Sequence, residues 1–219
     1  MTKDFAVIFD MDGVIVDSNP YHKIALEKFC RQHGHELSEQ QLREKIYGRT
    51  NKDWLTNLFG RMEEKKLLAY ADEKEGIFRE LYNDDIVPLK GLRGFLDLLD
   101  QHQIPRAIAT SAPRANVDFT LSKTGLTKYF PIILDDTFVS QGKPDPEIYL
   151  KAAAALSLPN GRCIVLEDSI SGVQAGKSAG SKVVGVLTTH TAAELSDTDQ
   201  VINNFEGLDP LSWIDLINP

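Results

Sequence analysis

Carboxylates, hydroxyls and one ammonium group stand at four places along this 219-residue chain, each just after an apolar run or just before a helical one. The side chains are Asp10, Asp12, Thr110, Ser111, Lys143, Glu167 and Asp168. Carboxylates that share one crevice repel one another, by about 4 kcal/mol for two unit charges about 4 Å apart at an effective dielectric near 20. A divalent cation relieves this repulsion, and a ligand set of oxygen atoms without Cys or His selects a hard cation. Mg²⁺ is the natural candidate because it shares its coordination with phosphate oxygens. The pattern therefore predicts a magnesium site for a phosphorylated substrate.

The elements that must position these groups are short apolar runs rich in β-branched residues. The runs cover residues 5–9, 106–109, 132–134, 163–166 and 182–186. Their hydrophobicity is nearly continuous, which is typical of strands buried on both faces of a sheet. Helical patterns alternate with them, so the sequence predicts an α/β fold with a Rossmann-like parallel sheet and helices on both faces. Loops at the carboxyl ends of parallel strands meet in one crevice, where we expect the reactive groups to converge.

Two local patterns give the helices more detail. Asp145 is expected as the N-cap of a helix, with Pro146 in its first turn. Gly172, Gly176 and Gly180 follow the fourth apolar run at a spacing of four residues. This series predicts close packing of a helix on the sheet, because the spacing does not fit a dinucleotide-binding loop.

Residues 17–85 break the alternation of strands and helices. They contain helical patterns of apolar residues and no convincing strand. An all-helical stretch of this length after the first strand predicts an inserted cap domain, residues 17–85, and a catalytic core made of residues 1–16 and 86–219. The alternative is that these helices belong to one larger core.

Composition and charge argue against several classes of protein. A net charge of −8 is unfavourable for holding nucleic acid or an anionic membrane by bulk charge. The two cysteines stand far apart and support no disulfide framework. The apolar run before Asp10 is too short for a signal peptide or a membrane span. The protein is therefore expected in the cytoplasm, by default as a monomer, with a small molecule as its partner.

The residues at the four reactive places resemble the four motifs of the haloacid dehalogenase superfamily. Phe-Asp-Met-Asp-Gly-Val at 9–14 resembles the first motif, and Ile-Ala-Thr-Ser at 108–111 resembles the second. Gly-Lys-Pro-Asp-Pro at 142–146 resembles the third, and Val-Leu-Glu-Asp-Ser at 165–169 the fourth. They occur in the family's order and span nearly the whole chain. The helical insertion is similar to the cap of the branch that contains β-phosphoglucomutase and small sugar-phosphate phosphatases.

The resemblance implies roles for the acidic residues. Asp10 would be the nucleophile that forms an aspartyl-phosphate, and its reference pKa of about 3.9 implies an ionised carboxylate at neutral pH. Asp12 would be the general acid that protonates the leaving oxygen, and then the general base for the next acceptor. Asp10, the backbone carbonyl of Asp12 and Asp168 would hold Mg²⁺. Glu167 would either bind the ion directly or support it through water.

The same resemblance implies which residues bind the substrate. Thr110 and Lys143 would bind the transferring phosphoryl oxygens, and Ser111 could add a backbone amide. In the cap, His22 matches a histidine of β-phosphoglucomutase-like proteins, which implies contact with the substrate or an influence on the acid–base residue. The alternative is a plain histidine on a helix surface.

A segment of the cap resembles the family's substrate-specificity loop. It runs from Gly48 and Arg49 to Lys52. Sugar-phosphate mutases carry an arginine where this chain has Asn51, and Arg49 or Lys52 could replace it in binding a second phosphate. Lys74 aligns loosely with another lysine of the cap, although a lysine on a cap helix is ordinarily solvated.

Three functions compete on this evidence. A phosphatase acting on a small phosphorylated metabolite, such as a sugar phosphate, is the leading hypothesis. A β-phosphoglucomutase that interconverts β-glucose 1-phosphate and glucose 6-phosphate is the alternative enzyme. A non-catalytic binding module would be expected to have lost Asp10 or Asp12, and this chain keeps both. Dehalogenation is disfavoured because displacement of a halide needs no acid at the position of Asp12.

Overall fold

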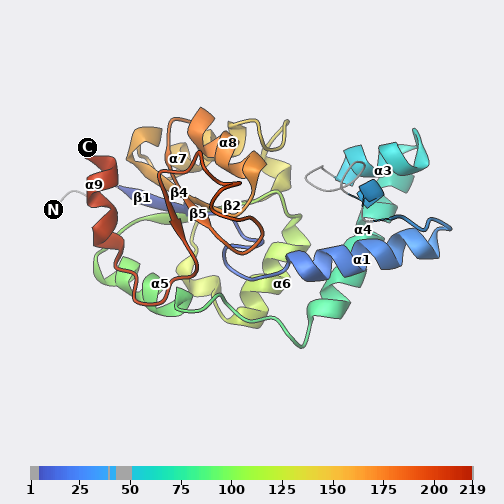
Figure 1. Cartoon of the computed structure of the whole chain (residues 1–219), viewed down its shortest axis with the longest axis horizontal. Coiled ribbons are helices and arrows are strands. Elements are labelled where there is room, and N and C mark those ends of the chain that lie inside the picture. The colour runs from blue at the N-terminus through green and yellow to red at the C-terminus, as the bar shows by residue number, and fades with distance from the viewer. Residues whose placement is uncertain (1–4, 39, 43–50, 219) are drawn as a thin grey trace. The chain divides into compact units, whose positions relative to one another are not determined.

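The computed structural model describes residues 5–38, 40–42 and 51–218 (Figure 1). The chain divides into two compact units. We call them the core unit, Met1–Asp17 with Ile86–Pro219, and the helical unit, Ser18–Asp85. Within the described residues, no helix is both long enough and apolar enough to cross a membrane.

A parallel sheet forms the centre of the core unit. Its six strands are β1 (Ala6–Phe9), β2 (Arg106–Ala109), β3 (Ile133–Leu134), β4 (Cys163–Glu167), β5 (Lys182–Val186) and β6 (Gln200–Ile202). The strand order is β3-β2-β1-β4-β5-β6, and every neighbouring pair is parallel. The chain builds outward from β1 in one direction and then from β4 in the other. The order therefore reverses between β1 and β4, which is where folds of this kind bind ligands.

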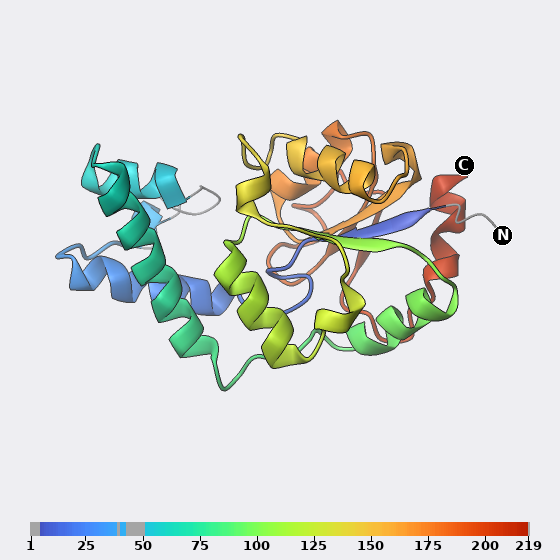
Figure 2. The same ribbon diagram turned by 180° about the vertical axis from the view of Figure 1, so that it is seen from behind.

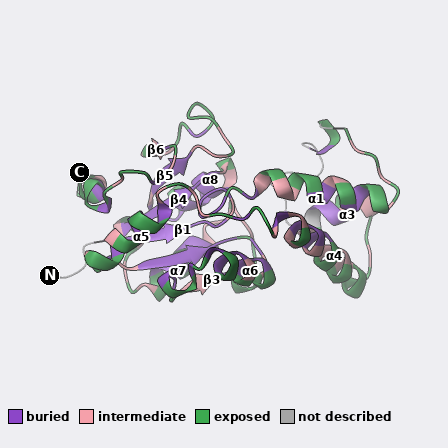
Figure 3. Cartoon of the chain, turned by 90° about the horizontal axis from the view of Figure 1, so that it is seen from below, coloured by how far each residue is buried: buried purple, intermediate pink, exposed green. Residues whose placement is uncertain are grey.

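The prediction of an α/β fold with a parallel sheet is confirmed. Every residue of β1, β2 and β4 is buried, as their continuous hydrophobicity indicated (Figure 3). The sixth strand was not predicted. It is a three-residue edge strand that begins with the exposed Gln200, so it lacks the apolar run by which the other strands are recognised.

Helices cover both faces of this sheet. They are α5 (Leu92–Gln101), α6 (Arg114–Thr124), α7 (Glu147–Ala155), α8 (Ile170–Ser178) and α9 (Ile214–Ile217). Short 3₁₀ turns lie at Thr127–Tyr129, Asp136–Phe138, Asn160–Arg162 and Pro210–Trp213. Helices α7 and α8 lie over one face, and α5 and α6 lie over the other (Figures 1 and 2).

The two faces of the sheet are packed differently. On the side of α7 and α8, aliphatic residues of the strands such as Ile8 and Val165 pack with Val173 and the alanines of both helices. On the other side aromatic rings dominate, with the centroid of Phe9 at 5.4 Å from that of Phe130 and 6.3 Å from that of Phe95. Both packings bury apolar area, the main favourable contribution to folding.

Glycines let α8 approach the sheet closely. A methyl group on Gly176 would lie 2.8 Å from Cγ2 of Val183, closer than side chains tolerate, so the predicted close packing is confirmed there. Gly180 has a different reason: its φ of +80° lies in the left-handed region that favours glycine. The start of α7 differs slightly from the prediction. Pro146 occupies the N-cap position, and Asp145 Oδ1 accepts from the backbone N–H of Glu147 at 2.9 Å.

The helical unit contains α1 (Asn19–Gln32), α3 (Asn51–Phe59) and α4 (Glu64–Tyr82). Within its described residues it has no strand. An aromatic cluster holds it together, in which the ring of Phe29 has centroid distances of 5.7 Å to Trp54 and 5.6 Å to Tyr70. Such edge-to-face pairs stabilise beyond the area they bury.

Candidate active site

Three acidic side chains meet at the carboxyl end of the central strands. Asp10 follows β1, Glu167 ends β4, and Asp168 follows it. One oxygen atom from each carboxylate lies within 4.8 Å of the other two, and all three residues are buried. The pairing of β1 with β4 explains this arrangement, because it brings the ends of both strands to one edge of the sheet.

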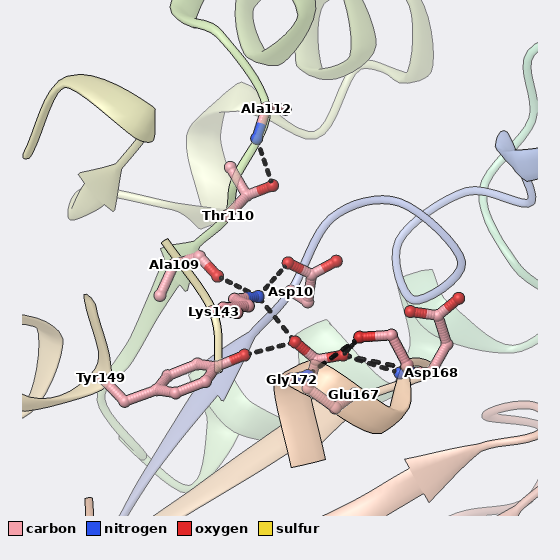
Figure 4. A network of polar contacts seen from close by, with 10 residues as sticks. Asp10, Ala109, Thr110, Ala112, Lys143, Tyr149, Glu167, Asp168 and Gly172 are labelled. Carbon is pink, nitrogen blue, oxygen red and sulfur yellow. Dashed lines mark hydrogen bonds and ion pairs between the residues drawn. The ribbon is translucent and has the colours of Figure 1, made fainter. Parts of the chain in front are cut away.

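Lys143 links two of these carboxylates. Its Nζ donates to Asp10 Oδ1 and to Glu167 Oε1, both at 2.6 Å, and to the backbone oxygen of Ala109 at 3.3 Å (Figure 4). The side chains of Lys143, Asp10 and Glu167 are 7%, 10% and 1% exposed. The only cation among these buried groups is therefore shared between two acids, while a third acid stands beside them.

The side chain of Glu167 is surrounded by donors. Its Oε1 accepts from Lys143 and from the hydroxyl of Tyr149, the latter at 2.6 Å. Its Oε2 accepts from the backbone N–H groups of Asp168 and Ser169 at 3.1 and 3.2 Å, and from the hydroxyl of Ser169 at 3.0 Å. A Cβ atom on Gly172 would overlap this carboxyl group. Glu167 is thus held in place by hydrogen bonds to both of its carboxylate oxygens and by the close approach of Gly172.

Asp10, Glu167 and Asp168 are all buried, but their pKa values shift in different directions. Burial raises the pKa of Asp10 to about 7; Lys143 opposes this, while Glu167 and Asp12 add to it. Burial also raises the pKa of Asp168 well above its ordinary value, and the charges of Glu167 and Asp10 raise it further. Burial alone would raise the pKa of Glu167, but Lys143 and the hydrogen bonds to the carboxylate outweigh it and hold that pKa below its usual value.

Burial thus makes Asp10 harder to ionise than its reference pKa implied. Three carboxylates face one ammonium group, so the site has too little positive charge to keep all of them ionised. A divalent cation would supply what is missing, because a bound ion favours the ionised form of its ligands. The donors are all oxygen atoms, so the residues present fit Mg²⁺.

The loop after β1 turns sharply around Gly13. Its φ is +75°, and its N–H donates to the backbone oxygen of Val16 at 2.7 Å. The backbone oxygen of Gly13 accepts from the hydroxyl of Thr188 at 2.6 Å, which ties the loop to the region after β5. Asp12 lies within this turn and is close enough to raise the pKa of Asp10 and of Asp168 by its charge. Its carboxylate is not one of the three that could together hold a metal.

Thr110 and Ser111 differ in their surroundings. Thr110 follows β2, beside β1, and is buried; its Oγ1 accepts from the N–H of Ala112 at 3.1 Å (Figure 4). Ser111 is exposed. The structure therefore brings Thr110 to the same edge of the sheet as Asp10, and the side chain of Ser111 faces solvent.

Two residues of this region were not singled out from the sequence. Tyr149 has its hydroxyl on Glu167 and its ring face 4.9 Å from Lys143 Nζ. Glu147 fixes the loop before Lys143, because its Oε2 accepts from Ser140 Oγ and from the backbone N–H groups of residues 140 and 141. Lys151 donates a hydrogen bond to Glu147 Oε1. This bond, together with those from residues 140 and 141, lowers the pKa of Glu147 to about 2. Tyr149 occupies an apolar helical position, which gave no sign of a polar role.

Several charged side chains of the helical unit are also buried. Lys74 is 6% exposed, so it is not the solvated lysine that is usual on a helix surface. Its Nζ lies 2.8 Å from Nδ1 of His22 and donates to Glu75 Oε1 at 3.0 Å. The His22 ring stacks on Phe78 with a centroid distance of 3.7 Å. His22 is therefore packed and hydrogen-bonded within the helical unit, and its contact with a substrate stays a prediction.

The remaining residues of the predicted specificity segment can be placed only in part. Asn51 begins α3, donates to Glu75 Oε1 at 3.2 Å and accepts from Trp54 Nε1 at 2.8 Å. Gly48 and Arg49 lie outside the described residues. Their roles therefore stay predictions.

Comparison with known proteins gives the chain its family. A family model described as haloacid dehalogenase-like hydrolase matches residues 7–186. The chain belongs to this family. The resemblance in the four motifs is thereby confirmed. The matched range contains every core residue to which the resemblance gave a role.

Relatives within the haloacid dehalogenase-like family include both hydrolases and mutases. The chain is 35% identical over 188 residues to a phosphorylated carbohydrates phosphatase of Thermotoga maritima, covering 83% of this chain and 85% of the relative. It is 32% identical over 191 residues to the β-phosphoglucomutase of Bacillus subtilis, covering 83% and 82%. A crystal structure of a family IA hydrolase from Entamoeba histolytica superposes with a TM-score of 0.89 at 32% identity, covering 98% of this chain and 100% of that one. The chain is accordingly an enzyme, a hydrolase or a mutase.

Proposed function

We propose that this enzyme removes phosphate from a small phosphorylated metabolite, such as a sugar phosphate, through an aspartyl-phosphate on Asp10. The observation that carries the proposal is the buried cluster of Asp10, Glu167 and Asp168 at the switch point of the sheet, in which Asp10 and Glu167 share one ammonium group. Its relatives support the substrate class, since a phosphorylated carbohydrates phosphatase is among them.

In the first half of the reaction a carboxylate oxygen of Asp10 attacks phosphorus. The bond from phosphorus to the leaving oxygen breaks, and Asp12 gives its proton to that oxygen. In the second half Asp12 takes a proton from water, the water oxygen bonds to phosphorus, and the bond to Asp10 breaks. Inorganic phosphate leaves, and both aspartates return to their starting states.

The charge on the transferring group is met by fixed groups of the core unit. Lys143 is held at 2.6 Å from Asp10 and would bind a phosphoryl oxygen, together with Thr110 and a backbone amide at Ser111. Asp10, Asp168 and the backbone carbonyl of Asp12 would hold Mg²⁺. When bound, the ion supplies positive charge to the phosphoryl oxygens, which is the main requirement of phosphoryl transfer.

Substrate selection is assigned to the helical unit, which we propose is a cap formed by residues 17–85. His22 and the segment with Gly48 and Arg49 would contact the part of the substrate that is not transferred. The support is the packing of His22 against Phe78 and Lys74, which holds its ring in one orientation.

A β-phosphoglucomutase is the second candidate, favoured by the identity to the enzyme of Bacillus subtilis. A mutase must bind a second phosphate and exclude water while the aspartyl-phosphate exists. Asn51 stands where mutases carry an arginine, and its amide is already bonded to Glu75 and Trp54. A neutral amide does not supply the bidentate charged contact of an arginine, so a mutase would need Arg49 or Lys52 for the second phosphate, and hydrolysis is preferred.

The test is a screen of phosphorylated metabolites with Mg²⁺ that measures both free phosphate and isomer formation. A phosphatase releases phosphate in proportion to the substrate consumed, whereas a mutase converts β-glucose 1-phosphate with little release. Asp10→Asn is the control, because it keeps the shape of the side chain and removes the nucleophile. Turnover of any phosphomonoester by this variant would contradict the assignment of Asp10.

A further inference from the structure

Tyr149 touches both members of the central ion pair. It lies on α7, and none of its surface is exposed. Its hydroxyl donates to Glu167 Oε1 at 2.6 Å, and the face of its ring lies 4.9 Å from Lys143 Nζ (Figure 4). The first contact stabilises the anion, and the second is a cation–π contact with its partner.

The Glu167 carboxylate accepts hydrogen bonds from the protein at both of its oxygens. Its two oxygens accept five hydrogen bonds from protein donors, two at Oε1 and three at Oε2. A carboxylate offers about four lone-pair sites, so its capacity as an acceptor is used. A metal ion could bind Glu167 directly only by displacing one of these donors. In this arrangement Glu167 serves to hold Lys143.

We propose that Tyr149 is a positioning residue, which fixes the Glu167–Lys143 pair so that Lys143 meets the oxygens of the transferred phosphoryl group. The inference rests on the proposed function, since it assigns Lys143 to those oxygens. Burial and the nearby Glu167 charge raise the pKa of Tyr149 well above its ordinary value, so the hydroxyl stays protonated and remains a donor.

A carboxylate held by fewer donors can rotate about its last bond. Without the Tyr149 hydroxyl, only Lys143 bonds to Glu167 Oε1, so that oxygen is held less firmly although Oε2 keeps its three donors. The ammonium group of Lys143 would then be positioned mainly by its ion pair with Asp10. The metal ligands Asp10 and Asp168 make no hydrogen bond to Tyr149 among the described contacts, so metal binding should be little changed.

The experiment compares Tyr149→Phe, which removes the hydroxyl and keeps the ring, with Tyr149→Leu, which removes both contacts. The matched control is Tyr129→Phe. Tyr129 is also buried in the core unit, and its hydroxyl also donates to a carboxylate, Asp97, at 2.6 Å. For each protein, calorimetry measures the binding of Mg²⁺ and of inorganic phosphate in the presence of Mg²⁺, kinetics measure kcat and KM, and thermal unfolding checks the fold.

We expect Tyr149→Phe to weaken phosphate binding and lower kcat by about tenfold, the effect of one lost hydrogen bond to a charged group. Tyr149→Leu should lose more, and the Kd for Mg²⁺ should change less than twofold in either variant. Tyr129→Phe should lower the melting temperature by a similar amount and leave kcat and phosphate binding unchanged.

Two results would overturn the inference. One is Tyr149→Phe with the phosphate affinity and kcat of the unchanged protein. The other is a loss of Mg²⁺ affinity larger than the loss of phosphate affinity, which would make Glu167 a metal ligand oriented by Tyr149. If the unchanged protein hydrolyses no phosphomonoester, the proposed function fails alone, because the phosphate and Mg²⁺ titrations need no turnover and still decide on Tyr149.

Discussion

Adding one methyl group at Gly172 should disrupt the active site from behind. Gly172 is buried in the first turn of α8, and a Cβ atom there would occupy the space of the Glu167 carboxyl group. That carboxyl group cannot move aside without breaking its hydrogen bonds to Lys143 and Tyr149. Gly172→Ala should therefore destabilise the protein, although alanine is the better helix former.

The size of the effect follows from the bonds that must break. A hydrogen bond to a charged group contributes about 1.5–3 kcal/mol, so the loss of two at Glu167 gives about 3–6 kcal/mol. Separating a buried ion pair costs about 3–5 kcal/mol, which agrees. Domains of this size are stable by about 5–15 kcal/mol in total, so the variant should lose a large share of its unfolding free energy.

The assay is urea unfolding of the variant, with Gly94→Ala as the control. Gly94 lies in α5, and a Cβ atom there would meet no atom within 4 Å. This control should be stabilised by up to about 1 kcal/mol, because alanine replaces glycine in a helix without a clash. Both variants are compared with the unchanged protein in the presence of EDTA, so that metal binding does not contribute.

A second background isolates the cause. Glu167→Ala removes the group with which the new methyl would collide, so Gly172→Ala should cost much less in that background than in the unchanged protein. The reasoning would be refuted by a loss below about 0.5 kcal/mol, the range of an ordinary surface change. It would equally be refuted by an equal loss in both backgrounds, since the Glu167 carboxyl group would then not be the obstacle.

Three further outcomes are expected. Asp12→Ala should lower kcat by about 10²–10⁴ on alkyl phosphates, which need a proton on the leaving group, and much less on activated aryl phosphates; an equal loss on both would contradict the acid role. EDTA should abolish turnover and Mg²⁺ restore it, and activity indifferent to chelation would remove the metal from the proposal. Burial raises the pKa of Asp10 from 3.8 to about 7, so its stabilising contribution in EDTA is complete below pH 3.8 and is lost as the pH rises through 7. Mg²⁺ binds the ionised form, so it should raise the melting temperature more at pH 8 than at pH 5.5, and a larger rise at pH 5.5 would contradict this.

Much of the fold was predictable because its signals are local. A strand buried on both faces must be apolar at every position, and β1, β2 and β4 are. The reactive groups could also be located, since a parallel sheet collects whatever follows its strands at one edge. β6 was missed because an edge strand beginning at the exposed Gln200 carries no such signal.

The features that could not be predicted depend on partners that lie far apart in the sequence. The environment of Lys74 was left open, and its ammonium group lies within hydrogen-bond distance of His22, 52 residues away, and of Glu75. Tyr149 was unremarkable among apolar helical residues, and its importance depends on Glu167, which is 18 residues away and on another element. The raised pKa of Asp10 could not be foreseen either, because a reference pKa contains no information about burial.

The ring cluster of Phe29, Trp54 and Tyr70 gives the helical unit a hydrophobic interior of its own. A substitution on the surface of that unit can therefore be tolerated without any change in the sheet. Under the proposed function, this separates two kinds of evolutionary change: the preference for one metabolite can drift by substitutions in the helices, while the chemistry at the end of β1 and β4 stays fixed. In this way one set of catalytic residues can serve for many different substrates.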